Sequence, residues 1–307
     1  MTKVLVATVK PFAPAAVDGI REVVEGAGFE MALLEKYESQ QDFINEAADA
    51  DAIIIRSDKA DADVIAAANN LKIIVRAGAG YDNVDLQAAS AKDVVVMNTP
   101  GQNSNAVAEL AIGMMVLMAR SQYNGTSGRE LKGKTLGIHA YGNVGRYVAN
   151  IARGFGMEIY AFDPFISKDD IEKDGVTAVD SVEELYTKCQ YISLHIPSNE
   201  HTKGSINADL LSLMPKGATL VNTARKEVIN EDDLLKVFAE RDDFIYISDI
   251  APDCKEEVAQ NYEGRFFFTP KKMGAQTAEA NINAGIAAAK QIQGFLNDGD
   301  RTFQVNK

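Results

Sequence analysis

A glycine-containing turn between two apolar runs carries the clearest chemistry in this sequence. The run Thr135–His139 leads into Ala140-x-Gly142-x-x-Gly145, and a second run, Ile159–Phe162, ends at the acidic residue Asp163. In a strand–turn–helix–strand unit, small residues let the backbone approach a pyrophosphate, which then lies on the N–H groups of a helix N-terminus. A carboxylate about 20 residues further on accepts hydrogen bonds from an adenosine ribose. The segment therefore predicts a dinucleotide site.

The residues around Asp163 also indicate which dinucleotide binds. A carboxylate repels a 2′-phosphate, and no arginine directly follows in Asp163-Pro164-Phe165, so NAD is favoured over NADP. Ala140 stands where the pattern usually has its first glycine, which costs little if its φ is negative and more if it is positive. The alternative interpretation is an ordinary crossover whose turn contains glycine.

Two arginines follow buried-strand patterns in the first third of the chain. Arg56, with Ser57 beside it, ends the apolar run that starts at Ala52, and Arg76 ends the run that starts at Leu71. Ligands of parallel sheets collect at the carboxyl ends of strands, and a guanidinium group pairs well with a carboxylate or phosphate. We therefore expect both arginines to face one anionic ligand. The alternative is a pair of solvent-facing side chains.

The elements that position these residues alternate between strand and helix patterns. Such alternation predicts an α/β protein with two doubly wound parallel-sheet domains, in which a Rossmann cofactor domain is inserted in a flavodoxin-like substrate domain. A long apolar helix over 108–119 marks the crossing, and a last helix over about 278–296 returns the chain to the first domain. We expect the substrate domain to comprise 1–98 and 283–307, and the NAD-binding domain 99–282.

Composition limits the classes of partner. The 307-residue chain has a formal net charge of −13, which disfavours nucleic acid and anionic membrane surfaces. An anionic substrate would need a local basic pocket. Two cysteines offer neither metal-ligand spacing nor a disulfide framework, and no apolar run reaches membrane length. We expect a cytoplasmic protein without a bound metal.

An ordered set of motifs extends this interpretation to nearly the whole chain. The motifs are Arg76–Asp85, Asn98–Glu109, Leu194–Pro197, Asn222–Arg225, and Thr269-Pro270 followed by Gly274–Thr277. With the nucleotide turn, they resemble the D-isomer-specific 2-hydroxyacid dehydrogenases. The resemblance is greatest to the branch that oxidises D-3-phosphoglycerate to 3-phosphohydroxypyruvate with NAD, on the route to serine. It implies a homodimer built through the cofactor domain. Because the chain stops at Lys307, we expect no C-terminal regulatory domain.

The resemblance also implies roles for individual residues. Arg225 would bind the substrate carboxylate and polarise the reacting oxygen, which suits a permanently charged fork of donors. The backbone of Ala77 and Gly78 would bind the carboxylate, and Arg56 and Arg76 would hold the phosphate. The implied cofactor contacts are Ala140, Tyr141, Gly142, Asn143 and Val144 at the pyrophosphate, Asp163 at the ribose, His195, Pro197, Thr202 and Thr223 along the nucleotide, and Asp249 at the nicotinamide carboxamide.

The sequence departs from the family where proton transfer is concerned. The family places a histidine after Thr-Pro, oriented by a glutamate, whereas this chain has Lys271-Lys272 with one extra residue. Either lysine occupies the position, depending on the end from which one counts. A lysine base needs its reference pKa of about 10.4 lowered, by desolvation and by the charge of Arg225. The alternative is that both lysines only supply positive charge.

The partner of that lysine is not assigned by the sequence. The glutamate position falls on Cys254, and Glu256 and Glu257 lie close by. His195 is interpreted as a structural residue beside the cofactor rather than as the missing base. Two other functions stay open: a glyoxylate or hydroxypyruvate reductase of the same family, and a relative that senses NAD(H) without catalysis.

Overall fold

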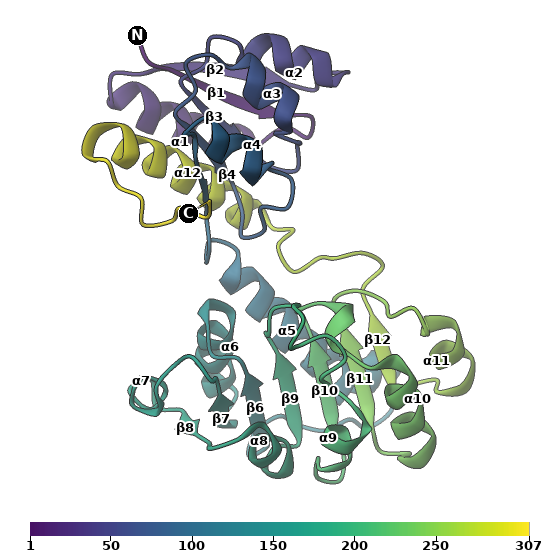
Figure 1. Cartoon of the computed structure of the whole chain (residues 1–307). Coiled ribbons are helices and arrows are strands. Elements are labelled where there is room, and N and C mark those ends of the chain that lie inside the picture. Colours follow the sequence, from purple (N-terminus) through teal and green to yellow (C-terminus); the bar gives the residue numbers. More distant parts are fainter. Residues whose placement is uncertain (307) are drawn as a thin grey trace. The chain divides into compact units, whose positions relative to one another are not determined.

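The computed structural model describes residues 1–306 and divides the chain into two compact units. Unit 1 comprises Met1–Asn103 and Thr277–Lys307, and unit 2 comprises Ser104–Gln276. These limits lie a few residues from those expected from the sequence. Each unit is built around one parallel β-sheet (Figure 1), so the predicted pair of parallel-sheet α/β domains is confirmed. Within residues 1–306, no helix is long and apolar enough to cross a membrane.

Unit 1 has a five-stranded sheet in the order β2-β1-β3-β4-β5. Its strands are β1 (Lys3–Thr8), β2 (Glu30–Glu35), β3 (Ala52–Ile55), β4 (Ile73–Arg76) and β5 (Val95–Asn98). Its helices are α1 (Pro14–Gly26), α2 (Gln40–Ala47), α3 (Ala62–Ala67), α4 (Leu86–Ala91) and α12 (Ala278–Asp298).

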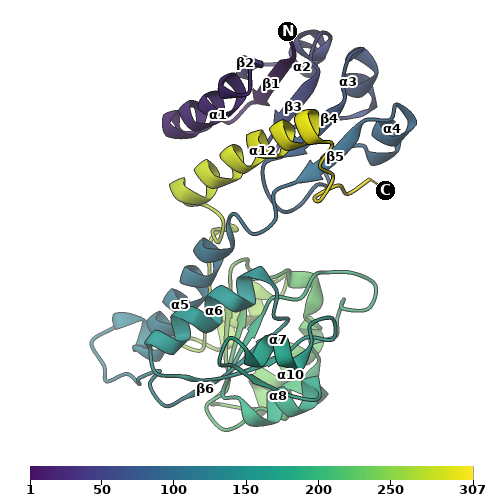
Figure 2. The ribbon, with the colours of Figure 1, turned by 90° about the vertical axis from the view of Figure 1, so that its left-hand side faces the viewer.

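Both faces of this sheet are covered because successive strand residues point to opposite sides. Val4, Val6 and Ile54 pack with α1 and α12, whereas Leu5 and Ile53 pack with α2, α3 and α4. Helices α1 and α12 lie side by side (Figure 2). The strands are therefore continuous apolar runs rather than alternating ones.

Unit 2 has a seven-stranded sheet in the order β12-β11-β10-β9-β6-β7-β8. The strands are β6 (Thr135–His139), β7 (Glu158–Phe162), β8 (Thr177–Ala178), β9 (Tyr191–Leu194), β10 (Thr219–Asn222), β11 (Ile245–Ser248) and β12 (Phe266–Phe268). The helices are α5 (Ser104–Ala119), α6 (Asn143–Gly154), α7 (Lys168–Glu172), α8 (Val182–Lys188), α9 (Ala208–Ser212), α10 (Glu231–Glu240) and α11 (Lys255–Asn261), with short 3₁₀ turns η1 (Ser121–Tyr123) and η2 (Lys226–Val228).

The strand order determines where ligands can bind. In unit 2, β6 lies between β7 and β9, so the direction of winding reverses beside β6. In unit 1, β1 lies between β2 and β3 in the same way. Open α/β sheets bind ligands at the carboxyl ends of strands next to such a reversal. The sequence motifs identified above follow the ends of β3, β4, β6, β7, β9, β10, β11 and β12.

Candidate active site

The turn after β6 leaves the N-terminus of α6 open. Gly142 is the N-cap residue of α6, and no side chain caps the helix. A Cβ built on Gly142 meets nothing within 4 Å, so there is space in front of the first N–H groups of α6. Backbone donors and the helix dipole there suit an anionic pyrophosphate. The residues present therefore fit a dinucleotide at this turn.

The two other small residues of the turn have different structural roles. Ala140 has φ 78°, the left-handed region in which alanine is disfavoured relative to glycine, so the costlier of the two expectations applies. At Gly145, a Cβ would lie 2.6 Å from the Ala140 carbonyl oxygen and 3.0 Å from Ile138. Glycine at this position lets α6 pack closely against β6.

Asp163 closes the turn from the end of β7. Its carboxylate accepts the N–H of Tyr141 and the N–H of Phe165, each at 2.8 Å. A carboxylate has about four acceptor positions, so it retains capacity for a hydroxyl group. Its contact with ribose stays a prediction, and the structure adds a second role in holding the turn.

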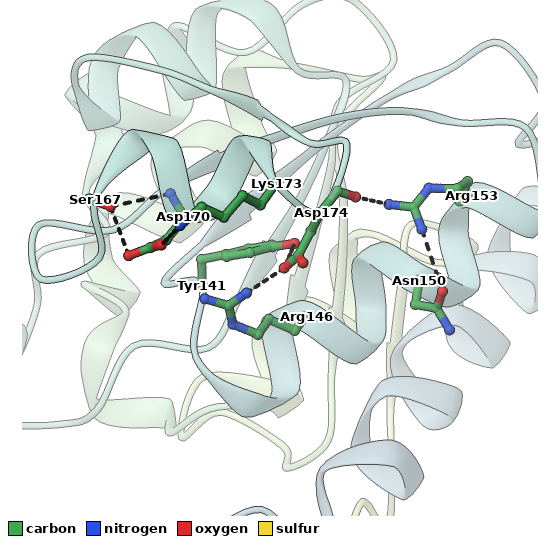
Figure 3. A network of polar contacts seen from close by, with 8 residues as sticks. All are labelled: Tyr141, Arg146, Asn150, Arg153, Ser167, Asp170, Lys173 and Asp174. Carbon is green, nitrogen blue, oxygen red and sulfur yellow. Dashed lines mark hydrogen bonds and ion pairs between the residues drawn. The ribbon is translucent and has the colours of Figure 1, made fainter.

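A polar network fixes the buried side chain of Tyr141 (Figure 3). The Tyr141 ring is buried, and the central carbon of the Arg146 guanidinium group lies 4.9 Å from the centroid of that ring. The Tyr141 hydroxyl donates to Asp174 at 3.1 Å. Arg146 forms an ion pair with the same carboxylate, and Arg153 donates to the Asp174 main-chain carbonyl. The Tyr141 ring is therefore held within the protein, and its N–H is donated to Asp163, so its contact with the cofactor stays a prediction. Sequence reasoning missed the network because its members are distant in the chain.

His195 lies at the end of β9 between two hydroxyl groups. Its Nε2 is 2.9 Å from Ser193 Oγ and its Nδ1 is 3.3 Å from Thr223 Oγ1. Burial lowers the pKa of His195 to about 3, with a smaller contribution from His139. The ring is therefore neutral at physiological pH and has no basicity to offer, which agrees with its interpretation as a structural residue.

Thr202 organises the loop that follows His195. Its hydroxyl donates to the Pro197 carbonyl at 2.6 Å and accepts the Asn199 N–H at 2.9 Å. The structure thus places Pro197, Thr202 and Thr223 around one loop and one strand end beside His195. Their contacts with a nucleotide remain predictions.

Three adjacent strands of unit 2 bring the remaining predicted residues together. Asn222 pairs in register with Ser248, and Ser248 pairs with Phe268, so β10, β11 and β12 end at the same level. The segments that follow these ends carry Arg225, Asp249 and Lys272, respectively. Buried Asn222 shapes the first segment, because it accepts the Ala224 N–H and donates to the Arg225 carbonyl, both at 2.9 Å.

Arg225 and Lys272 share one acceptor. The guanidinium group of Arg225 and Nζ of Lys272 each donate to the Ala224 carbonyl oxygen at 3.0 Å. Lys272 exposes more than a third of its surface, yet the protein desolvates its ammonium group enough to lower its pKa. This desolvation and then the Arg225 charge bring the pKa to about 8, against the opposing effect of Asp249 and Glu227.

The structure distinguishes the two lysines. Lys271 is exposed, and within residues 1–306 it forms no ion pair and no side-chain hydrogen bond. Lys272 is the one that meets the Arg225 segment. Of the carboxylates near the expected glutamate position, Glu231 is bound by the N–H groups of Asp253 and Cys254, at 2.9 and 2.8 Å. Burial and this carboxylate raise the pKa of the Cys254 thiol to about 12, so it is not a nucleophile at neutral pH.

In unit 1, the two predicted arginines lie on neighbouring strand ends. Arg76 Nε donates to the Arg56 carbonyl oxygen at 2.9 Å, and Arg56 Nη2 donates to Asn281 on α12 at 2.6 Å. The Arg56 guanidinium group also lies 5.0 Å from the centroid of the Phe12 ring. Burial lowers the pKa of both guanidinium groups, but they stay charged because their ordinary values lie so high.

The loop after β4 is shaped by Arg76. Gly78 has φ 149°, and a Cβ there would lie 1.6 Å from Arg76 Nη1, so glycine is required beneath this guanidinium group. Ala77 donates its N–H to the Ile55 carbonyl at 2.8 Å, which extends the sheet by one bond. That N–H is therefore used within the protein, and Ser57 lies exposed at the end of β3.

Groove size alone does not identify the site. A groove of about 790 Å³ in unit 2 is lined by Tyr191, Thr219 and Ile245, which begin β9, β10 and β11. It therefore lies at the amino ends of the strands, opposite the residues described above. Within residues 1–306, no group of three or more histidine, cysteine or acidic residues could hold a metal ion.

The fold and the turn after β6 define an α/β protein of the dinucleotide-binding class, and comparison with known proteins makes this specific. Residues 106–261 match the family model "D-isomer specific 2-hydroxyacid dehydrogenase, NAD binding domain". The chain belongs to the D-isomer specific 2-hydroxyacid dehydrogenase family. Its cofactor is NAD, as the sequence predicts.

Individual relatives carry two different names. D-3-phosphoglycerate dehydrogenase of Methanocaldococcus jannaschii is 36% identical over 281 residues, which are 84% of this chain and 52% of the relative. The chain thus spans about half the length of that relative. Hydroxypyruvate reductase of Thermotoga maritima is 36% identical over 264 residues, 80% of this chain and 84% of the relative. The crystal structure of NAD⁺-bound 3-phosphoglycerate dehydrogenase from Entamoeba histolytica has a TM-score of 0.84 at 51% identity, and covers 100% of this chain and 99% of that one.

Proposed function

We propose that the protein oxidises D-3-phosphoglycerate to 3-phosphohydroxypyruvate with NAD, as part of serine biosynthesis. The observation that carries the proposal is the pair Arg225 and Lys272, whose cationic groups donate to the same carbonyl oxygen. They follow the ends of β10 and β12, which flank β11 in the unit that contains the NAD-binding domain. The names of the relatives support the same reaction.

The chemistry assigns each group one task. NAD, when bound, accepts the hydride that leaves C2, and the C2–O bond becomes a carbonyl as the hydroxyl proton departs. Lys272 in its neutral form takes that proton, and Arg225 holds the substrate carboxylate and stabilises the negative charge that develops on oxygen. In the reverse direction, the Lys272 ammonium group returns the proton. A pKa lowered to about 8 suits Lys272 to the proton transfer that the family assigns to a histidine.

Recognition of the phosphate is assigned to unit 1. Arg56 and Arg76 supply two permanent positive charges in a chain with net charge −13, and the glycine at 78 keeps the surface beside Arg76 free of a side chain. Guanidinium groups bind phosphate by paired donors. Backbone groups of the 77–78 loop and exposed Ser57 are the nearest further candidates for the substrate anion.

The test is oxidation of NADH by the purified chain with 3-phosphohydroxypyruvate, glyoxylate or 2-oxoglutarate as the acceptor. We expect the phosphorylated substrate to give the highest kcat/KM. Lys272→Ala should abolish most of the turnover, and Lys271→Ala should retain it. Retention of turnover in both variants would remove Lys272 from the mechanism, and equal loss in both would favour the alternative in which the two lysines only supply positive charge.

The second candidate is a hydroxypyruvate or glyoxylate reductase, which the name of the Thermotoga relative supports. Such an enzyme does not need two arginines for a phosphate. Arg76→Lys and Arg56→Lys should raise KM for 3-phosphohydroxypyruvate far more than KM for glyoxylate. If both substrates are affected equally, the reductase is the better assignment. NADH binding without turnover of any acceptor would instead indicate a sensor.

We also infer a homodimer built through the cofactor domain and a cytoplasmic location. The dimer follows from the resemblance, and light scattering coupled to size exclusion measures it directly. The location follows from two free thiols, of which Cys189 is buried, because such thiols persist in a reducing compartment. Cell fractionation with a specific antibody tests it.

A further inference from the structure

Asp249 directly follows β11, and its carboxylate is buried inside unit 2. Only 1% of its surface is exposed. Its Oδ1 accepts the Thr269 hydroxyl at 2.9 Å and the Met273 N–H at 2.7 Å, and its Oδ2 accepts the Gly274 N–H at 2.8 Å. All three donors belong to the segment that follows β12. The carboxylate therefore lies inside the loop that carries the two lysines.

A buried carboxylate without a cation is costly to retain. Within residues 1–306, Asp249 forms no ion pair, and its charge is balanced by two backbone N–H groups and one hydroxyl. Desolvating an ionised group costs several kcal/mol unless hydrogen bonds compensate. A neutral residue of similar shape would spare that cost. The three bonds to one loop indicate that the carboxylate is retained to shape the loop.

The bonds act on Lys272 from both sides of its position in the chain. Thr269 begins the segment, and Met273 and Gly274 directly follow Lys272. Gly274 fits because a Cβ there would lie 2.9 Å from Asp249 Oδ2, so only glycine brings its N–H this close. Between these anchored residues, Lys272 Nζ donates to the Ala224 carbonyl, which follows the end of β10.

We propose that Asp249 is the positioning residue for Lys272 and takes the place of the orienting glutamate that the family pairs with its histidine. The proposal rests on the proposed function, in which Lys272 transfers the proton. Cys254, at the expected glutamate position, begins α11, and its N–H is bound to Glu231. Asp249 instead folds the lysine loop by accepting its backbone N–H groups. This role differs from the carboxamide contact that the sequence resemblance implies.

The first variant is Asp249→Asn, which keeps the size and removes the charge. An amide accepts on one side only, so one set of loop donors must face an N–H group. We expect kcat to fall roughly 10- to 100-fold, the range seen when groups that orient a reactive side chain are removed. KM for 3-phosphohydroxypyruvate and Kd for NADH should change less than about threefold, because the groups expected to bind the substrate anion and the pyrophosphate lie on other segments.

A second readout does not depend on turnover. The rate at which an amine reagent modifies Lys272, followed by peptide mass spectrometry across pH, reports the titration of its ammonium group. The charged groups that face it are Arg225, Asp249 and Glu227. Removing Asp249's charge should shift the midpoint to lower pH. If the wild-type chain turns over no acceptor, the proposed function fails, and this titration still tests the positioning role.

Two further variants separate charge from position. Thr269→Val removes one hydrogen bond and keeps the carboxylate, so kcat should fall by less and the Lys272 midpoint should stay. Gly274→Ala pushes against Oδ2 and should lower kcat with the charge intact, which covers the case in which Asp249→Asn does not fold. Glu263→Gln, at an exposed position after α11, should leave kcat and the midpoint unchanged.

The outcomes divide clearly. A fall in kcat at saturating NADH with a shifted Lys272 midpoint in Asp249→Asn supports the proposal. Unchanged kcat and midpoint overturn it. A tenfold loss of NADH affinity with unchanged kcat also overturns it, and would establish Asp249 as a nicotinamide contact instead.

Discussion

At the scale of single residues, the site depends on one carbonyl oxygen. Ala224 accepts from both Arg225 and Lys272, and buried Asn222 fixes the peptide that presents this oxygen. Two cations held at one acceptor repel each other, which favours the neutral form of the lysine. A lysine so placed can exchange a proton near neutral pH, whereas an ordinary lysine stays charged.

The first prediction concerns pH. Because the pKa of Lys272 is lowered to about 8, the neutral amine is scarce below pH 8 and predominates above it. In the proposed mechanism oxidation needs the neutral amine, so its kcat should rise through about pH 8. Reduction needs the ammonium group, so its kcat should fall through the same range. Steady-state rates in both directions from pH 6 to 10 check this.

Lys272→Met and Lys271→Met provide the matched controls for the pH profile. Residual activity in Lys272→Met should lose the transition near pH 8, and Lys271→Met should retain it. A transition that persists in Lys272→Met would assign the proton to another group.

At the scale of elements, the turn between β6 and α6 combines an open helix end with two tight contacts. The left-handed alanine and the glycine against β6 set the path of the backbone, and the glycine N-cap leaves space for a ligand. We therefore expect the stability of the turn and its affinity for NAD to depend on different residues, although these residues lie within six positions of one another.

The second prediction compares the two glycines. Gly142 has φ −77°, and a Cβ built there meets no atom within 4 Å. Gly142→Ala should therefore change the free energy of unfolding by less than about 0.5 kcal/mol. It should lower NADH affinity about tenfold or more, because the added Cβ would enter the expected path of the pyrophosphate. Gly145→Ala should destabilise the fold by about 1–3 kcal/mol through overpacking. Urea unfolding and NADH fluorescence titration measure both. Equal effects of both variants on stability would contradict this division.

The third prediction concerns Ala140. Ala140→Gly relieves the positive φ, worth about 1–2 kcal/mol, and adds chain entropy to the unfolded state, worth about 0.4–1 kcal/mol. We expect a net gain in stability of up to about 1.6 kcal/mol, and a loss for Ala140→Val, whose branched side chain tolerates this conformation poorly. Urea midpoints at constant slope decide between these signs. Destabilisation by glycine would show that Ala140 packing outweighs its strain.

At the scale of the whole molecule, unit 1 is assembled from both ends of the chain. Helix α12 packs with α1 on the sheet (Figure 2), and the Asn306 side chain lies beside the edge strand β5. The Asn306 side chain accepts the Val96 N–H and donates to the Val94 carbonyl, both at 2.8 Å. The side-chain amide thus adds to the backbone bond from the Val305 N–H to the Val96 carbonyl, at 2.9 Å, and together they cover the outer edge of β5.

The fourth prediction tests this long-range tie. Asn306→Ala leaves a buried N–H and a buried carbonyl without partners, so the free energy of unfolding should fall by about 1–3 kcal/mol. The exposed Asn261→Ala, on α11, is the matched control and should change it by less than about 0.5 kcal/mol. Thermal or urea unfolding of both variants provides the comparison. Equal effects would mean that the amide contributes nothing specific.

Local sequence patterns predicted the helices and strands. Apolar runs predicted β6 and β7 to within a residue, because strands buried on both faces need continuous apolar sequence. Residues at strand ends could be recognised in the same way. Apolar runs end at Arg56, Arg76 and Asp163, so each of these residues lies at the carboxyl edge of its own sheet. The sequence by itself also determined the family and the cofactor.

Contacts between distant segments could be decided only by the tertiary structure. Sequence spacing could not choose between Lys271 and Lys272, because the choice depends on which side chain reaches Ala224, 48 positions away. Nor could it show that Asp249 accepts from the lysine loop, because that bond depends on the register of β11 and β12. Local sequence determines secondary structure and strand ends, whereas hydrogen bonds between strand-end loops arise only when the sheet aligns them.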